Sequence, residues 1–249
     1  MIIHAFDDKS EPLFSPGSFY GEQKRFCDIC IVTFSNVIYE AMRNGFACEQ
    51  IAKISLANGA IPICRFEHEG RSIAFYLSAI GSALAGTCVL EANWLTGATK
   101  FIMFGSAGSL NRQVTEGKYV IPTEAYRDEG LSYHYAPPAD YISIPGSEKL
   151  AEIFASLGLP FVKGRVWTTD AIYRETVNKV KQRRQEGCIA VEMELAGVQA
   201  VCDFCGFELY DFLVTGDVLD EGSYDIAGFS GANHDLDKLY VALQTAKRI

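Results

Sequence analysis

Positive charge, long apolar runs and histidine are scarce in this sequence. Its 249 residues include 22 Lys and Arg against 31 Asp and Glu, which gives a formal net charge of −9. A nucleic-acid-binding surface needs a positive field, so this balance argues against nucleic acid as a partner. No run approaches the roughly 18 apolar residues of a membrane span, and the opening MIIHAFDDKSEP lacks the basic start and cleavage site of a secretory signal. We expect a cytoplasmic protein that binds neither nucleic acid nor membrane.

Linkers, repeats and low-complexity segments are lacking as well. No stretch rich in Pro, Gly or Ser divides the chain, and no internal similarity returns at a fixed period. With 49% apolar and 21% charged residues, the composition is that of a globular protein. A chain of this length can bury a large core without a metal or a disulfide. We therefore predict a single domain over residues 1–249.

The eight cysteines include two C-x-x-C pairs, Cys27 with Cys30 and Cys202 with Cys205, which is a spacing of zinc ligands. The first pair opens the extended run CDICIVTF, where residues three apart point to opposite faces. The second pair has the spacing of a packed helical stripe. We predict buried free thiols in a reducing compartment rather than a metal site.

Extended apolar segments alternate with helical patterns along most of the chain. Strands are predicted at residues 27–34, 61–66, 72–77, 100–104, 119–123, 161–167 and 208–215. Helices are predicted at residues 36–43, 82–95, 148–157, 194–205 and 236–247. Glu69-Gly70 predicts a hairpin between the second and third strands. This alternation predicts an α/β fold with a mixed central β-sheet flanked by helices.

Segments that could carry chemistry follow predicted strands, which is where open α/β sheets place ligands. Gly105-Ser106-Ala107-Gly108 predicts a loop whose backbone N–H groups face an anion, or else a tight turn. Val191-Glu192-Met193-Glu194 places two carboxylates around a methionine, and a carboxylate suits the cis-diol of a ribose. An acidic first helical turn also accounts for Glu194 but leaves Glu192 unexplained.

Two further segments hold an acid and aromatic rings. Asp217 ends Val214-Thr215-Gly216-Asp217 and is either a general acid or an ordinary turn residue. Trp167 and Tyr173 could stack on a flat heterocycle, although Trp167 equally suits the core. His134 is one of only four histidines and is either catalytic or structural.

Taken together, these segments resemble the nucleoside phosphorylase family, the purine nucleoside and uridine phosphorylases, over residues 27–245. The most specific element is Val191-Glu192-Met193-Glu194 followed by Leu-Ala-Gly, which is similar to the family's ribose-binding stretch. The segment from Gly105 to Gly108 resembles its phosphate loop, and Thr215-Gly216-Asp217 resembles its purine-type acid motif. The stretch from Arg127 to Pro137 is closer to the uridine phosphorylase branch.

The resemblance implies a nucleoside and phosphate as the partners, with phosphate as co-substrate and neither cofactor nor metal. The implied ribose-binding residues are Glu192, Met193 and Glu194. The implied phosphate-binding residues are Thr33, Gly105 and Ser106.

The base end of the implied site carries the proton donor. Asp217 would protonate N7 of a purine as the glycosidic bond breaks, and Trp167, Thr168 and Arg174 would contact the base. His134 is a further candidate. An anionic nucleophile below the sugar and an acid beside the base would stabilise the charges that bond cleavage creates.

This chain departs from the family pattern where the family carries arginine. Met103 replaces an arginine before the phosphate loop, and no arginine follows the first strand, where Ser35 and Asn36 stand. Thr176 and Asn178 replace the side chains that read uracil. We expect a purine nucleoside phosphorylase that yields free base and ribose 1-phosphate.

Three alternatives remain open. The missing arginines suggest a nucleosidase that uses water, although no carboxylate follows the first strand where related hydrolases carry their base. Uridine phosphorylase-type activity and a nucleoside-binding protein without turnover are the other two. Because the family usually completes each site with a neighbouring subunit, a homo-oligomer, either a dimer or a hexamer, is expected.

Overall fold

The computed structural model describes residues 1–220 and 222–249. Its strands are β1 (Ile29–Thr33), β2 (Glu49–Leu56), β3 (Gly59–His68), β4 (Arg71–Leu77), β5 (Lys100–Ser109), β6 (Tyr119–Asp128), β7 (Tyr141–Ser143), β8 (Phe161–Thr169), β9 (Cys188–Glu192), β10 (Glu208–Asp220) and β11 (Ser223–Asp225). Its helices are η1 (Ile2–His4), α1 (Gly17–Tyr20), α2 (Asn36–Gly45), α3 (Ser82–Thr96), α4 (Arg112–Thr115), α5 (Ser132–Tyr135), α6 (Gly146–Ser156), η2 (Ile172–Arg174), α7 (Val177–Gln185), α8 (Leu195–Cys205), α9 (Phe229–Asn233) and α10 (Asp237–Ala246).

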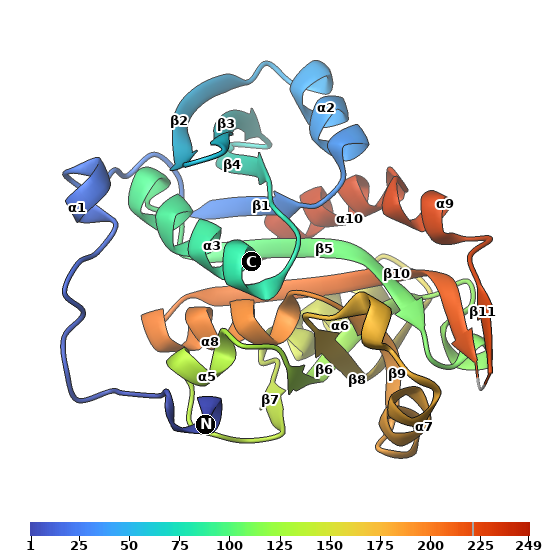
Figure 1. The fold of residues 1–249 in the computed structure, drawn as a ribbon. Coiled ribbons are helices and arrows are strands. Elements are labelled where there is room, and N and C mark those ends of the chain that lie inside the picture. The colour runs from blue at the N-terminus through green and yellow to red at the C-terminus, as the bar shows by residue number, and fades with distance from the viewer. Residues whose placement is uncertain (221) are drawn as a thin grey trace.

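One mixed sheet runs in the order β11-β10-β6-β8-β9-β5-β1-β4-β3-β2, with β7 paired to β6 (Figure 1). β4, β1, β5 and β10 are parallel neighbours, and β2 and β3 extend the sheet as antiparallel strands. Because β10 also pairs with β5, the strands β5, β9, β8, β6 and β10 close into a ring. The predicted α/β fold with a mixed central sheet is confirmed.

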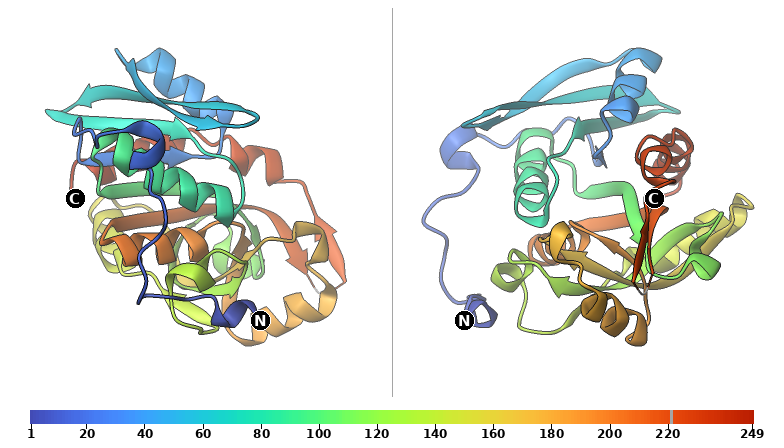
Figure 2. Two further views of the ribbon diagram at one scale, coloured as in Figure 1. Left: turned by 60° about the vertical axis from the view of Figure 1, so that its left-hand side comes forward. Right: turned by 45° about the vertical axis from the view of Figure 1, so that its right-hand side comes forward.

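Helices cover both faces of this sheet because its strands are apolar on both faces. In β1, Cys30 and Val32 belong to one buried cluster, and Ile29 and Ile31 belong to another. Helices α3 and α8 bury their apolar residues in the first cluster, and α2, α6 and α10 bury theirs in the second. Figure 2 shows α3 and α10 on opposite sides of the strands.

The chain before β1 runs along the outside of the body, from η1 beside α5 to α1 beside the end of α3 (Figure 1). No helix within residues 1–220 and 222–249 is both long and apolar enough to cross a membrane. All eight cysteines lie in this part of the chain as free thiols, and six of them are buried. The predicted buried thiols are therefore confirmed except at Cys48 and Cys205, which are half-buried.

Two strands at the centre are longer than the sequence predicts. β5 continues to Ser109, so the glycine-serine segment after Phe104 is strand and not a loop. Gly108 is required there by packing, because a Cβ atom would lie 2.5 Å from Leu219 Cδ1 and 3.0 Å from Val191 Cγ1. β10 likewise continues past Thr215, with an irregularity in its pairing to β5 before Val218. Asp217 therefore lies within a strand instead of a turn.

Some elements have no counterpart in the sequence prediction. α7 has the sequence VNKVKQRRQ, which is too polar to show an apolar helical period. β2 is largely exposed at the edge of the sheet, and α9 and β11 are very short. Each of these elements is held by its neighbours in space, and that information is absent from a local pattern.

Candidate active site

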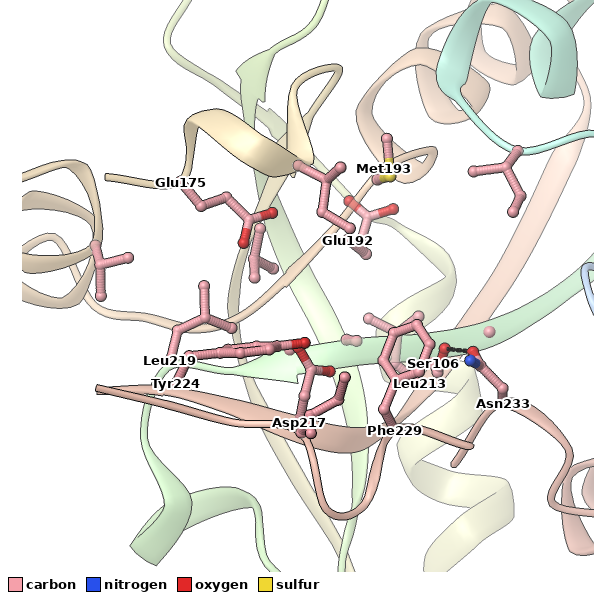
Figure 3. Close-up of a pocket in the computed structure, with 18 of the residues that line it drawn as sticks. Ser106, Glu175, Glu192, Met193, Leu213, Asp217, Leu219, Tyr224, Phe229 and Asn233 are labelled. Carbon is pink, nitrogen blue, oxygen red and sulfur yellow. Dashed lines mark hydrogen bonds between the residues drawn. The ribbon is translucent and has the colours of Figure 1, made fainter. Parts of the chain in front are cut away.

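A cavity of about 880 Å³ lies at the carboxyl ends of β5, β9 and β10 (Figure 3). Two short elements after β10, namely β11 and α9, form further walls of this cavity. The segment after η2 forms another. The polar lining of the cavity consists of Ser106, Tyr173, Glu175, Glu192, Glu194, Asp211, Asp217, Asp220, Ser223, Tyr224, Asn233 and His234. Neither arginine nor lysine lines it among the residues that the structure describes. The cavity is therefore rich in carboxyl groups.

Glu192 is held by three hydrogen bonds at the end of β9. The backbone N–H groups of Glu194 and Leu195 each donate to its Oε2 at 2.7 Å, and the Thr168 hydroxyl donates to its Oε1. Thr168 also accepts a hydrogen bond from the Ala196 N–H at 3.0 Å, which fixes its hydroxyl in place. The position of this carboxylate is thus set by β8 and by the first turn of α8.

Glu194 lies one residue before α8, and its Oε1 accepts a hydrogen bond of 2.6 Å from the Gly81 N–H. Burial raises the pKa of both Glu192 and Glu194, and the charge of Glu192 raises that of Glu194 further. The donors around Glu192 act in the opposite direction and favour its ionised form. Together with Met193, these two residues form the wall that the sequence assigns to ribose, and all three line the cavity.

Asp217 faces this wall from the other side of the cavity (Figure 3). Burial raises the pKa of Tyr224 to about 12, with further contributions from the charge of Asp217 and from its hydrogen bond to the tyrosine hydroxyl. Glu175 points toward the same space, and burial together with the charge of Asp217 raises its pKa to about 7. Two carboxyl groups with different environments therefore meet at this end of the cavity.

The opposite end holds hydroxyl and amide groups. The Ser106 hydroxyl donates a hydrogen bond to Asn233 Oδ1, which joins β5 to α9 (Figure 3). Behind them lies a second cavity of about 30 Å³, whose polar lining includes Thr33, Ser35 and Lys238. Of the residues that the sequence assigns to phosphate, Gly105 and Ser106 line both cavities, and Thr33 lines the small one.

Besides Thr33, four residues proposed from the sequence lie outside the large cavity. Trp167 is fully buried beneath the site, and its indole N–H donates to Asp128 at 3.1 Å, so its ring is not available to stack on a base. Thr168 is fully buried and holds Glu192 instead of reaching a base. Arg174 and His134 are exposed on the short helices η2 and α5. Trp167 and Thr168 are therefore not free to contact a base, and the roles of Arg174 and His134 stay predictions.

The structure adds residues that the sequence did not identify as a group, namely Tyr224, Asn233 and His234 in the segment after β10. His234 Nδ1 lies 2.8 Å from Ser35 Oγ, across from the first turn of α2. No local pattern marks these three residues, because β11 and α9 are too short to be predicted.

Asp211 did carry a signal in the sequence, since it is a lone charge inside the apolar run ELYDFLV. Its side chain is 1% exposed, and both carboxyl oxygens lack a hydrogen-bond partner among the described residues. Burial, reinforced by the charges of Glu192 and Glu194, raises its pKa well above the ordinary value. Its burial therefore favours the protonated form of Asp211.

The fold and this cavity define an α/β protein with a cavity of the size of a small-molecule site at the carboxyl ends of its strands. The chain belongs to the phosphorylase superfamily, since that family's description matches residues 28–249. The resemblance to nucleoside phosphorylases found in the sequence is thus confirmed.

Curated relatives are moderately similar. A purine nucleoside phosphorylase, DeoD-type, of an Exiguobacterium species is 25% identical over 188 residues, which make up 73% of this chain and 78% of that protein. A guanosine phosphorylase of Halorubrum lacusprofundi is 26% identical over 147 residues, which make up 58% of this chain and 60% of that protein.

Solved structures share the fold at lower identity. The 5'-methylthioadenosine/S-adenosyl homocysteine nucleosidase of Campylobacter jejuni superposes with a TM-score of 0.73 at 16% identity, over 90% of this chain and 100% of that one. The AMP nucleosidase of Bacteroides thetaiotaomicron superposes with a TM-score of 0.70 at 17% identity, over 89% and 88% of the two chains.

Proposed function

We propose that this protein is an enzyme that cleaves the N-glycosidic bond of a purine nucleoside with phosphate, giving free base and ribose 1-phosphate. The observation that carries the proposal is the arrangement of three groups around one cavity. Glu192 with Glu194 lies on one wall, Asp217 lies on the opposite wall, and Ser106 lies at one end (Figure 3). These groups match the three parts of the reaction, which are the sugar, the leaving base and the nucleophile.

Each group has a separate task. Glu192 and Glu194 accept hydrogen bonds from the ribose hydroxyls, and the negative charge of Glu192, whose ionised form three donors favour, stabilises the positive charge that develops on the sugar. A phosphate oxygen attacks C1' while the C1'–N9 bond breaks and its electron pair passes to the base. Asp217 donates a proton to N7 of that base, which neutralises the leaving group. Glu175, whose pKa is raised to about 7, can hold a proton near neutral pH beside Asp217.

The purine preference rests on Asp217 and on the relatives. A general acid aids a purine because N7 accepts a proton, and uracil has no equivalent ring nitrogen. The similar curated proteins are named as purine nucleoside and guanosine phosphorylases. Uridine phosphorylase-type activity lacks comparable support, since Thr176 and Asn178 stand where the family reads uracil.

Cleavage by water is the second candidate. It is favoured by the absence of arginine and lysine from the lining of the large cavity among the described residues, because a phosphate dianion is held best by charge-assisted hydrogen bonds. The structural neighbours named as nucleosidases share only the fold with this chain, so they do not decide between the two nucleophiles.

The test is product analysis with and without phosphate. Purified protein is incubated with inosine, adenosine, guanosine or uridine, and free base is measured by chromatography. Base release from purines that requires phosphate supports the proposal, and release without phosphate supports the nucleosidase. If no base forms but a nucleoside raises the melting temperature, the protein is a nucleoside binder without turnover.

Asp217→Asn tests the role of the acid. The amide has no proton of the required acidity, so kcat falls by about 100- to 10,000-fold, while the dissociation constant of the nucleoside changes little. Unchanged turnover would remove Asp217 from the mechanism. Glu175→Gln is the matched control, because it changes the neighbouring carboxyl in the same way.

The homo-oligomer, a dimer or a hexamer, stays a prediction. Large apolar side chains at the mouth of the cavity support it, since Ile80, Tyr173 and Ile226 are exposed by 64%, 95% and 62%. Clusters of exposed apolar side chains at a rim are typical of protein contact surfaces. We propose that a second copy of the chain covers this mouth.

A further inference from the structure

Lys238 is a buried cation that the mechanism above does not use. It is the second residue of α10, and it is 1% exposed. Its Nζ donates hydrogen bonds to the backbone carbonyl oxygens of Ala232 and Asn233, at the end of α9. An ammonium group has three N–H donors, so one remains after these two bonds.

No carboxylate neutralises Lys238 directly. Among the described residues, no Asp or Glu forms an ion pair with it. Burial lowers its pKa to about 8, and the more distant charge of Asp235 offsets part of this effect. A buried ammonium without a counter-ion is unfavourable, so an anion that approached it would be bound strongly.

The surroundings of Lys238 match the chemistry of a tetrahedral oxyanion. The small cavity beside it is also lined by Thr33, Ser35 and Ser106, three hydroxyl groups that can each donate a hydrogen bond. Ser106 and Asn233 line the large cavity as well, so their mutual hydrogen bond lies where the two spaces adjoin. A rotation of the Asn233 side chain would join them.

We propose that Lys238 supplies the cationic charge that holds inorganic phosphate at the Ser106 end of the large cavity, and so selects phosphate over water as the nucleophile. This inference rests on the proposed function for the role of phosphate in the reaction. It accounts for the lack of arginine at Met103 and after β1, because a lysine from the C-terminal helix takes over the charge that those positions lack.

The volume of the small cavity defines where the phosphate lies. A space of about 30 Å³ holds a single water molecule, and a phosphate ion is larger. The phosphate therefore lies mainly in the large cavity against Ser106 and Gly105. Asn233 turns away from Ser106, which frees the serine hydroxyl to donate to the phosphate and opens the path to the Lys238 ammonium.

The test compares Lys238→Gln with Lys247→Gln in phosphate-dependent base release. Glutamine keeps two N–H donors for the carbonyl oxygens of α9 but removes the charge. We expect the KM for phosphate to rise about 10- to 100-fold and the KM for the nucleoside to stay within about twofold. Lys247→Gln removes an equal charge from an exposed lysine that pairs with Glu69, and neither KM should change.

The possible outcomes separate this inference from the proposed function. A folded Lys238→Gln protein with an unchanged KM for phosphate would overturn the role of Lys238. Base release at full rate without phosphate would also overturn it, while glycosidic cleavage would stand.

If no nucleoside is cleaved, inorganic phosphate alone still tests the site by its effect on the melting temperature. A stabilisation of the wild type that is absent in Lys238→Gln supports the site, and no stabilisation of the wild type refutes it. If Lys238→Gln does not fold, Ser106→Ala takes its place, and it should raise the KM for phosphate selectively. An unchanged KM in that variant contradicts the proposed position of the phosphate.

Discussion

Thr168→Val tests how a buried residue of β8 controls the protonation of Glu192, on the cavity wall that the sequence assigns to ribose. Thr168 is fully buried, and its hydroxyl is the only side-chain donor to Glu192 among the described residues. Valine has nearly the same shape, so the substitution removes this hydrogen bond without creating a cavity. The Thr168 hydroxyl lowers the pKa of Glu192 against the larger effect of burial, so its loss raises that pKa further.

The size of the effect follows from the strength of the lost bond. A hydrogen bond to a charged group contributes about 1.5–3 kcal/mol, and about 1.4 kcal/mol corresponds to one pH unit. In the proposed mechanism Glu192 binds the ribose hydroxyls as a carboxylate, so activity should fall when Glu192 is protonated. We therefore expect the acidic limb of the pH profile of kcat/KM to move upward by about one to two pH units in Thr168→Val. Activity near neutral pH falls accordingly and recovers at higher pH.

The assay is the pH dependence of base release, and Thr169→Val is its matched control. The two hydroxyls each accept one backbone N–H, from Ala196 and Ala171 respectively, so both variants lose a comparable backbone partner. Only Thr168 donates to Glu192. Because Glu175 also has a pKa of about 7, the profile is repeated in a Glu175→Gln background. A Thr168→Val limb that overlays the wild type, or an equal movement in Thr169→Val, would refute the reasoning.

Two further predictions concern stability. Asp211→Leu replaces a buried carboxyl group, whose oxygens have no hydrogen-bond partner among the described residues, by an apolar group of the same branching. The free energy of unfolding should rise by about 1–3 kcal/mol, and each kcal/mol should raise Tm by about 2–4 °C. The folded pKa of Asp211 lies above its ordinary value of 3.8, so stability is lost as pH rises above about 4. The gain from leucine should therefore grow toward neutrality and be smallest in melts below about pH 4. Gly108→Ala places a Cβ 2.5 Å from Leu219 Cδ1 and 3.3 Å from Asp217 Oδ2. It should lower the free energy of unfolding by about 1–3 kcal/mol, and turnover should fall as well. An unchanged melting curve would contradict the close packing of β5 against β10.

The sequence by itself determined the elements with a strong local period and the residues that follow them. The apolar run before Ser35 and the glycine stop after Cys205 mark β1 and the end of α8, and both are present. Glu192 could be singled out because an acidic first helical turn accounts for Glu194 but leaves Glu192 unexplained. Asp217 could be singled out as a lone acid near the end of a predicted strand, and both residues line the cavity.

Only the tertiary structure decided which of the candidates meet. Trp167 has a ring that could stack on a base, but the pairing of β8 with β6 and β9 places this ring in a buried cluster. The glycine-serine segment has the composition of a loop, but β10 continues its pairing beside it and keeps it extended. Propensity is a local property, and in both cases neighbours that are distant in the sequence overrode it.

The end of the large cavity at Ser106, with the small cavity beside it, depends entirely on tertiary structure. Its residues are spread over most of the chain and include Thr33, Ser106 and Lys238. The pairing of β5 with β1 and β10, together with α10 on one face of the sheet, places them around one small cavity. A sequence pattern indicates the type of a single helix or strand, whereas a site of this kind depends on the distances between several elements. The sequence therefore pointed to the carboxyl groups, and only the fold shows that the buried Lys238 lies at the same small cavity as Thr33 and Ser106.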